Sequence, residues 1–189
     1  AGARVMMGWI GRLFGAHTAR PQHASLERVD TTSQDTERAC EEHLAAGEAL
    51  LRAGQVEAAL QRFTAAIEIE HDNARAHCLH GMALLQQGDL EEAGHSFSMS
   101  LVFDPAMAQA HQGTALVEGR LGNFDAAFSA SERALQCGPP TAELFNQRGA
   151  WLGKKDDFAG AACCFEQAIQ LDERYALAHN NLGHVLLCH

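Results

Sequence analysis

The chain has 189 residues and a net charge of −10, from 14 Lys and Arg against 24 Asp and Glu. This acidic balance repels a phosphate backbone and argues against nucleic acid as a partner. The four Pro and a scarcity of Val, Ile and Tyr argue against a sheet-rich fold, and no apolar run approaches the roughly 20 residues that cross a bilayer. The composition therefore predicts a soluble protein without a sheet-rich fold.

Residues 1–39 are expected to form an N-terminal amphipathic segment followed by a polar linker, TTSQDTER at 31–38, whose Ser, Thr and Asp can cap the next helix. Residues 5–17 contain three glycines, so a helix there needs a supporting surface. We expect this segment to occupy apolar surface of residues 40–189, within one chain or between two copies, or to stack on them as a cap. A membrane interface is a weaker candidate. The side chains gathered on its apolar face are Val5, Met6, Trp9, Ile10, Leu13 and Phe14.

From residue 40 onward the sequence repeats with a period of 34 residues. The repeat divides residues 40–189 into units 40–73, 74–107, 108–141 and 142–175 and a half unit, 176–189. One column holds small residues and a second holds Phe in three of four units; a third holds a turn glycine that Asp156 replaces in the fourth unit. The columns are Gly47, Gly81, Ala115, Gly149 and Gly183; Phe63, Phe97, Ser131 and Phe165; and Gly54, Gly88 and Gly122.

Each unit contains two helical patterns joined by a short turn with Gly, which predicts an antiparallel helix pair. One pair cannot bury its apolar faces alone, so neighbouring pairs must stack. The segment HCLHGMALLQQGDLEEAGHSFSMSLVFDP, at 77–105, resembles the tetratricopeptide repeat (TPR) family, and the resemblance covers residues 40–189. It implies an all-α, right-handed superhelical solenoid of antiparallel helix pairs.

The resemblance also implies a scaffold or adaptor that binds a peptide or partner segment in the concave groove formed by the first helix of each unit. The alternative is a substrate-docking domain cut from a larger enzyme such as a glycosyltransferase or methyltransferase. Apolar anchors and amide groups along the groove suit an extended peptide. The expected groove residues are Leu44, Glu48, Arg75, Cys78, Met82, Leu85, Gln109, Gln112, Leu116, Arg120, Glu143, Asn146, Gln147, Asn180 and Asn181.

The Asn ladder of the glycosyltransferase-linked TPR proteins is at best half present, with Asn181 in the place of one rung. The last helical pattern leaves apolar residues on its outer face, Leu182, Leu186 and Leu187. We therefore expect a chain that continues beyond His189, rather than a capping helix, and self-association of the 189-residue chain through this face.

Histidine and cysteine carry no recognisable site. The six cysteines lack CxxC spacing, which favours reduced thiols and a cytoplasmic location. A mitochondrial location is the alternative, because residues 1–26 contain Arg and no acid. We expect no metal, no cofactor and no enzymatic activity, since phosphate loops and nucleophile motifs are missing. The histidines of one column are expected to be packing residues: His43, His77, His111 and His179.

The third unit departs from the repeat at two columns. Glu118 stands where the other units have Leu, and Ser131 stands in the Phe column. A buried carboxylate is unfavourable without a partner. Glu118 is therefore expected either to reach the edge of the array or to mark a flexible joint or ligand contact.

Overall fold

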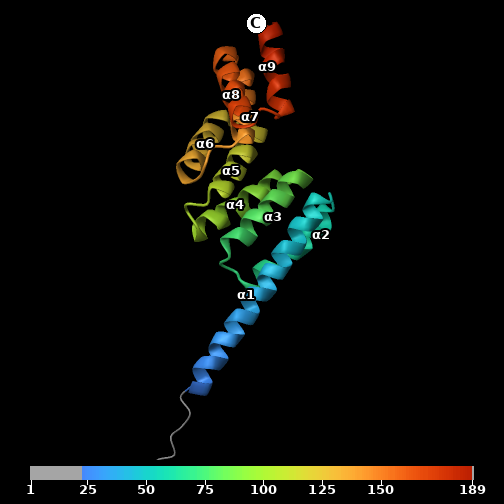
Figure 1. The fold of residues 1–189 in the computed structure, drawn as a ribbon, viewed down its shortest axis with the longest axis vertical. Helices are drawn as coiled ribbons and strands as arrows, with labels where there is room; N and C mark the ends of the chain where they lie inside the picture. Colours follow the sequence, from blue (N-terminus) through green and yellow to red (C-terminus); the bar gives the residue numbers. More distant parts are fainter. Residues whose placement is uncertain (1–22, 189) are drawn as a thin grey trace, which may run out of the picture. The chain divides into compact units, whose positions relative to one another are not determined.

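The computed structural model describes residues 23–188, and the chain divides into two compact parts, 1–36 and 37–189. Of the N-terminal part, the structure describes residues 23–36, which are helical. The segment predicted at 5–17 lies outside the described residues. All regular secondary structure described is helical (Figure 1). The helices are α1 (His23–Arg52), α2 (Val56–Ile69), α3 (Ala74–Gln87), α4 (Leu90–Phe103), α5 (Ala108–Leu121), α6 (Phe124–Cys137), α7 (Ala142–Lys154), α8 (Phe158–Leu171) and α9 (Ala176–Cys188).

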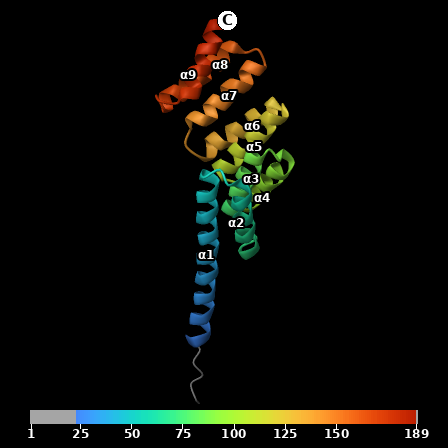
Figure 2. The same cartoon turned by 90° about the vertical axis from the view of Figure 1, so that its right-hand side faces the viewer.

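Within residues 37–188 the helices pack as successive pairs. Helix α3 packs with α4, α5 with α6, and α7 with α8, and each pair stacks on the next (Figure 2). The first helices of the units from α3 onward begin at residues 74, 108, 142 and 176, so the helices keep the 34-residue period of the sequence. The predicted all-α array of antiparallel helix pairs is confirmed. No helix in the described part of the chain is long and apolar enough to cross a bilayer.

The prediction of a polar linker at residues 31–38 is wrong, because helix α1 runs through this stretch without a break. Neither Gly nor Pro occurs between residues 22 and 46, so nothing in the sequence terminates the helix. Arg38 and Glu42 form an i,i+4 ion pair with Nε 3.0 Å from Oε1, which favours the helix further. Ser and Thr in this stretch are therefore helical residues rather than caps.

The small-residue column and the Phe column contact each other directly. A Cβ built on Gly149 would lie 2.6 Å from Cε1 of Phe165, and one on Gly81 would lie 2.9 Å from Cε1 of Phe97. Each ring therefore lies flush against the backbone of the first helix in its own unit. In the third unit the first side chain is larger and the second is smaller, because Ala115 replaces the glycine and Ser131 replaces the phenylalanine. Both residues are fully buried.

The turn between units is held by the histidine column. Nε2 of His77 lies 3.0 Å from the carbonyl oxygen of His71, and the same bond joins His111 to Pro105 and His179 to Glu173. Each histidine thus contacts the carbonyl six residues before it, in the loop that precedes its helix. In the first unit that loop is replaced by helix α1, and His43 has a buried Nδ1 with no partner among the described residues.

The third unit accommodates both of its unusual residues. Glu118 is half-buried and its Oε2 accepts a hydrogen bond from Nδ2 of Asn123 at 2.9 Å, so the carboxylate reaches the edge of the array. The Ser131 hydroxyl donates to the Phe128 carbonyl and accepts from Nη1 of Arg148, both at 2.7 Å. The Arg148 guanidinium also lies 5.3 Å from the Phe128 ring centroid. Polar contacts and a cation–π contact therefore replace the missing Phe.

Candidate functional site

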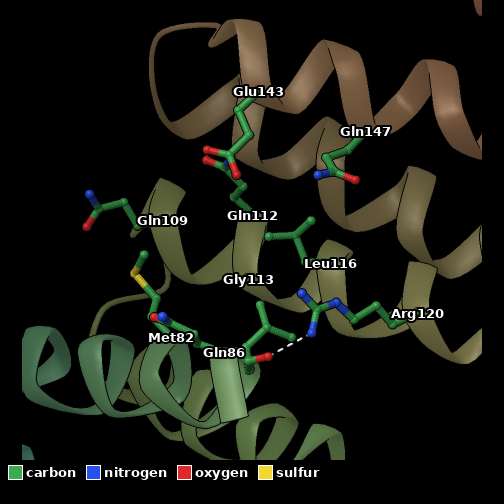
Figure 3. A pocket seen from close by; sticks show the side chains of 10 residues that line it. Met82, Gln86, Gln109, Gln112, Gly113, Leu116, Arg120, Glu143 and Gln147 are labelled. Atoms are coloured by element: carbon green, nitrogen blue, oxygen red, sulfur yellow. Dashed lines mark hydrogen bonds between the residues drawn. The ribbon is translucent and has the colours of Figure 1, made fainter. Parts of the chain in front are cut away.

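A cavity of about 360 Å³ opens between α3, α5 and α7, and we call it the central cavity. Figure 3 shows side chains from these three helices converging on one space. Eight of the predicted groove residues line it, together with Gln86 and Gly113. The eight are Met82, Leu85, Gln109, Gln112, Leu116, Arg120, Glu143 and Gln147.

The lining of the central cavity combines an apolar floor with a polar rim. Met82, Leu85 and Leu116 supply the apolar surface, and Met82 is 41% exposed although its side chain is large and apolar. Four glutamines supply amide groups, each of which can both donate and accept hydrogen bonds. One cation, Arg120, and one anion, Glu143, complete the rim, so the cavity itself has no strong net charge.

Arg120 is held in place by the backbone of the neighbouring helix. Its Nη1 donates to the Leu85 carbonyl at 2.7 Å, drawn as a dashed line in Figure 3. That carbonyl belongs to the last turn of α3, where carbonyls lack a partner within the helix and the helix dipole is negative. The contact orients the guanidinium across the cavity, and the guanidinium has five N–H donors in all, more than this one bond uses.

Four of the predicted groove residues in the first two units line neither the central cavity nor any ligand surface: Leu44, Glu48, Arg75 and Cys78. Leu44 and Cys78 are 0% and 1% exposed, so their assignment to the groove is wrong. Leu44 packs in the core cluster that includes Leu79 and Ala83 of α3. Cys78 packs in the core cluster that includes Ala110 and Val117 of α5, and burial raises the pKa of its thiol to about 12.

Arg75 and Glu48 are partners of each other. Nη2 of Arg75 lies 2.7 Å from Oε1 of Glu48, and Nη1 lies 2.8 Å from Oε2 of Glu41. The hydrogen bond to Glu48, and then the charge of Glu41, raise the pKa of Arg75 against the opposing effect of burial. This triad links α1 to α3, so two of the predicted ligand contacts instead join adjacent units.

The predicted asparagines at the far end divide into three environments. Asn146 is 5% exposed and accepts a hydrogen bond from Nδ2 of Asn181 at 2.8 Å. Asn180 is exposed. Asn181 lines a second cavity of about 200 Å³ between α7, α8 and α9, which we call the end cavity. Its lining is Gly149, Ala150, Gly153, Lys154, Phe158, Phe165, Asn181, His184 and Val185.

The structure adds Gln86 and Gly113 to the predicted site. A Cβ on Gly113 would overlap the Phe97 ring, so this position can hold no side chain and leaves room above it for the central cavity. A glycine in the middle of a helix is costly and signals a close approach of this kind. Gln86 follows Leu85 at the end of α3, and no sequence signal distinguishes it. In the described part of the chain, no group of three or more His, Cys, Asp or Glu side chains could hold a metal ion.

The family model described as TPR repeat matches residues 47–88, which include the helices α2 and α3 and the turns before and after them. Residues 47–88 therefore carry a tetratricopeptide repeat. No curated protein sequence matches it. Such repeats are in general protein-interaction modules, so the TPR array implies a protein or peptide partner.

Solved structures of other TPR proteins have the same fold. PilF of Pseudomonas aeruginosa is 18% identical, with a TM-score of 0.74 over 81% of this chain and 70% of its own. YrrB, a TPR protein with an unusual peptide-binding site, is 27% identical, with a TM-score of 0.59 over 66% of this chain and 64% of its own. A thermophilic TPR protein from Thermus thermophilus is 19% identical, with a TM-score of 0.68 over 87% of this chain and 93% of its own.

Proposed function

We propose that the TPR array binds an extended segment of a partner protein across α3, α5 and α7, with an apolar side chain of that segment in the central cavity. The observation that carries the proposal is the apolar floor of the cavity, formed by Met82, Leu85 and Leu116, of which Met82 is 41% exposed. A Met side chain adapts its shape to different ligands and is common at peptide-binding surfaces. The peptide-binding site named for YrrB, a similar TPR protein, supports the same class of ligand.

The polar rim supplies the remaining recognition. An extended peptide presents alternating N–H and C=O groups, and the amides of Gln109, Gln112 and Gln147 can pair with both. Glu143 favours a cationic side chain at the α7 side of the cavity, while Arg120 favours a carboxylate or carbonyl near the end of α3. We accordingly propose that the array recognises its partner and catalyses no reaction.

The test is selection of peptides from a random displayed library on the whole chain, followed by titration calorimetry with the best peptide. Met82→Glu places a charge on the apolar floor and is expected to weaken binding at least tenfold, because an apolar anchor would then have to desolvate a carboxylate. Val102→Glu is the matched control, since Val102 is 68% exposed and lies on α4 outside the cavity. Equal affinity for wild type and Met82→Glu would contradict the proposal.

A further inference from the structure

One contact between neighbouring units is made by side chains of different size at each interface along the array. It joins a residue near the end of the first helix, a residue of the second helix, and a residue of the next unit's first helix. The core clusters, the ring contacts and the neighbours of each glycine identify its members in the first three interfaces. Applying the 34-residue period gives the fourth interface. The four sets are Leu51, Leu60 and Ala83; Leu85, Gly94 and Val117; Gly119, Phe128 and Trp151; and Gly153, Ala162 and Val185.

At the third interface two aromatic rings fill the space. Trp151 is 4% exposed, and its indole lies so close to Gly119 that any Cβ there would overlap it. The Trp151 ring meets the Phe128 ring edge to face, with centroids 5.8 Å apart. The first two interfaces are filled by leucine, from Leu51 and Leu60 in one and Leu85 in the other.

The fourth interface has no large side chain at the three equivalent sequence positions. Gly153 occupies the place of Gly119, yet no atom lies within 4 Å of a Cβ built on it. Val185 and Ala162 stand where the third interface has Trp151 and Phe128. The consequence is the end cavity, whose volume is about 200 Å³ and whose walls include Gly153, Phe165 and Val185.

The size and chemistry of the end cavity fit an aromatic ring. Apolar cavities of about 150 Å³ accommodate benzene, and the equivalent space one unit earlier holds an indole. The rim is polar, with Lys154, Asn181 and His184. The Asn181 amide is oriented by its bond to Asn146, and its carbonyl oxygen can accept an indole N–H. Lys154 can approach the face of a ring as a cation.

We propose that the end cavity binds a tryptophan side chain of the partner peptide, in the place that Trp151 fills one unit earlier. The peptide source of the ring rests on the proposed function, since α7 contributes residues to both cavities and one extended segment can cross it. The affinity of the cavity for a free indole ring does not depend on that function.

The first experiment titrates the whole chain with 5-fluoroindole, followed by fluorine NMR. Val185→Trp reproduces the Trp151 arrangement and fills the cavity from within, and Gly153→Leu reproduces Leu85 at the same place. Both are expected to weaken 5-fluoroindole binding at least tenfold and to raise the melting temperature. Leu187→Trp is the matched control, because Leu187 is 88% exposed on the same helix, and it should bind like wild type. No binding to wild type, or unchanged binding in both filled variants, would overturn the proposal.

The second experiment separates this inference from the proposed function. A peptide selected on the array should lose affinity at least tenfold when its tryptophan is replaced by alanine, and should bind more weakly to Val185→Trp. If such a peptide is sensitive to Met82→Glu but indifferent to both of these changes, the end-cavity proposal fails and the proposed function stands. If no peptide binds while 5-fluoroindole still binds wild type and not Val185→Trp, the proposed function fails and the ring specificity of the cavity stands.

Discussion

At the residue scale, the array contains pairs of contacting positions in which a small side chain at one makes room for a large side chain at the other. Phe165 is possible because Gly149 leaves the helix backbone open beneath the ring, whereas Ser131 is matched by Ala115 in the same two columns. Protein interiors are packed too closely for one member of such a pair to change alone. The pairs therefore explain why two columns depart from the repeat together in the third unit.

Gly149→Ala should destabilise the protein by about 1–3 kcal/mol, because the new methyl would lie 2.6 Å from a ring that is itself buried. Gly183→Ala is the matched control in the same column of α9, where nothing lies within 4 Å of the Cβ. Alanine there should be neutral or stabilising by up to about 1 kcal/mol through helix propensity. Urea denaturation measures the free energy of unfolding of both variants. An equal loss in the two would contradict the idea that contact with the Phe ring explains the small residue at this position.

At the element scale, the turn inside each unit has one geometry that the sequence satisfies in two ways. Gly54, Gly88 and Gly122 have φ of 75°, 100° and 84°, and Asp156 adopts φ of 62° at the same place in the fourth unit. The residue after each of them donates its backbone N–H to a carbonyl five residues earlier, for example Asp157 to Leu152 at 3.0 Å. Stacking of the helix pair thus imposes a left-handed residue even where no glycine is available.

Asp156→Gly should stabilise the protein by about 1 kcal/mol, since a left-handed conformation is unfavourable for a residue with a Cβ. Gly88→Ala should cost a similar amount for the same reason, because its Cβ would meet no other atom within 4 Å and only the backbone is strained. Thermal and urea unfolding of the two single variants measure the changes. Destabilisation by Asp156→Gly would mean that the aspartate contributes contacts that outweigh its backbone strain.

The helix boundaries from α2 onward were predictable because turns, most of them with Gly, recur every 34 residues. The start of α1 was not, since Ser, Thr and Asp at residues 30–36 suit a cap as well as a helix and only the lack of Gly or Pro distinguishes the two. In the groove, Met82 and Leu116 line the central cavity, and their role as ligand contacts stays a prediction. Leu44 and Cys78 were assigned to the groove wrongly, because both are buried in core clusters. Gln112 belongs to the same column and lines the central cavity, so the 34-residue period alone does not decide which members of a column face the groove.

At the scale of the whole molecule, each helix pair among residues 37–188 contacts its neighbours. Substitutions at equivalent repeat positions therefore create different sites along one repeated architecture. The ion triad of Arg75 joins the first two units, the central cavity lies between the first helices of the second, third and fourth units, and the end cavity lies between the fourth unit and α9. Helix α9 also exposes Leu186 and Leu187, at 66% and 88%, while Leu182 is half-buried. Self-association through the face formed by Leu182, Leu186 and Leu187 stays a prediction.

The most direct measurement of the central claim is methyl NMR of the whole chain during titration with the library-selected peptide. The account predicts saturable shifts of the Met82 ε-methyl and the Leu116 δ-methyls, which line the central cavity, with the Val102 methyls of α4 unchanged. The opposite result, in which the peptide saturates the protein while Met82 and Leu116 stay unperturbed and shifts cluster around Val102, would contradict binding across α3, α5 and α7.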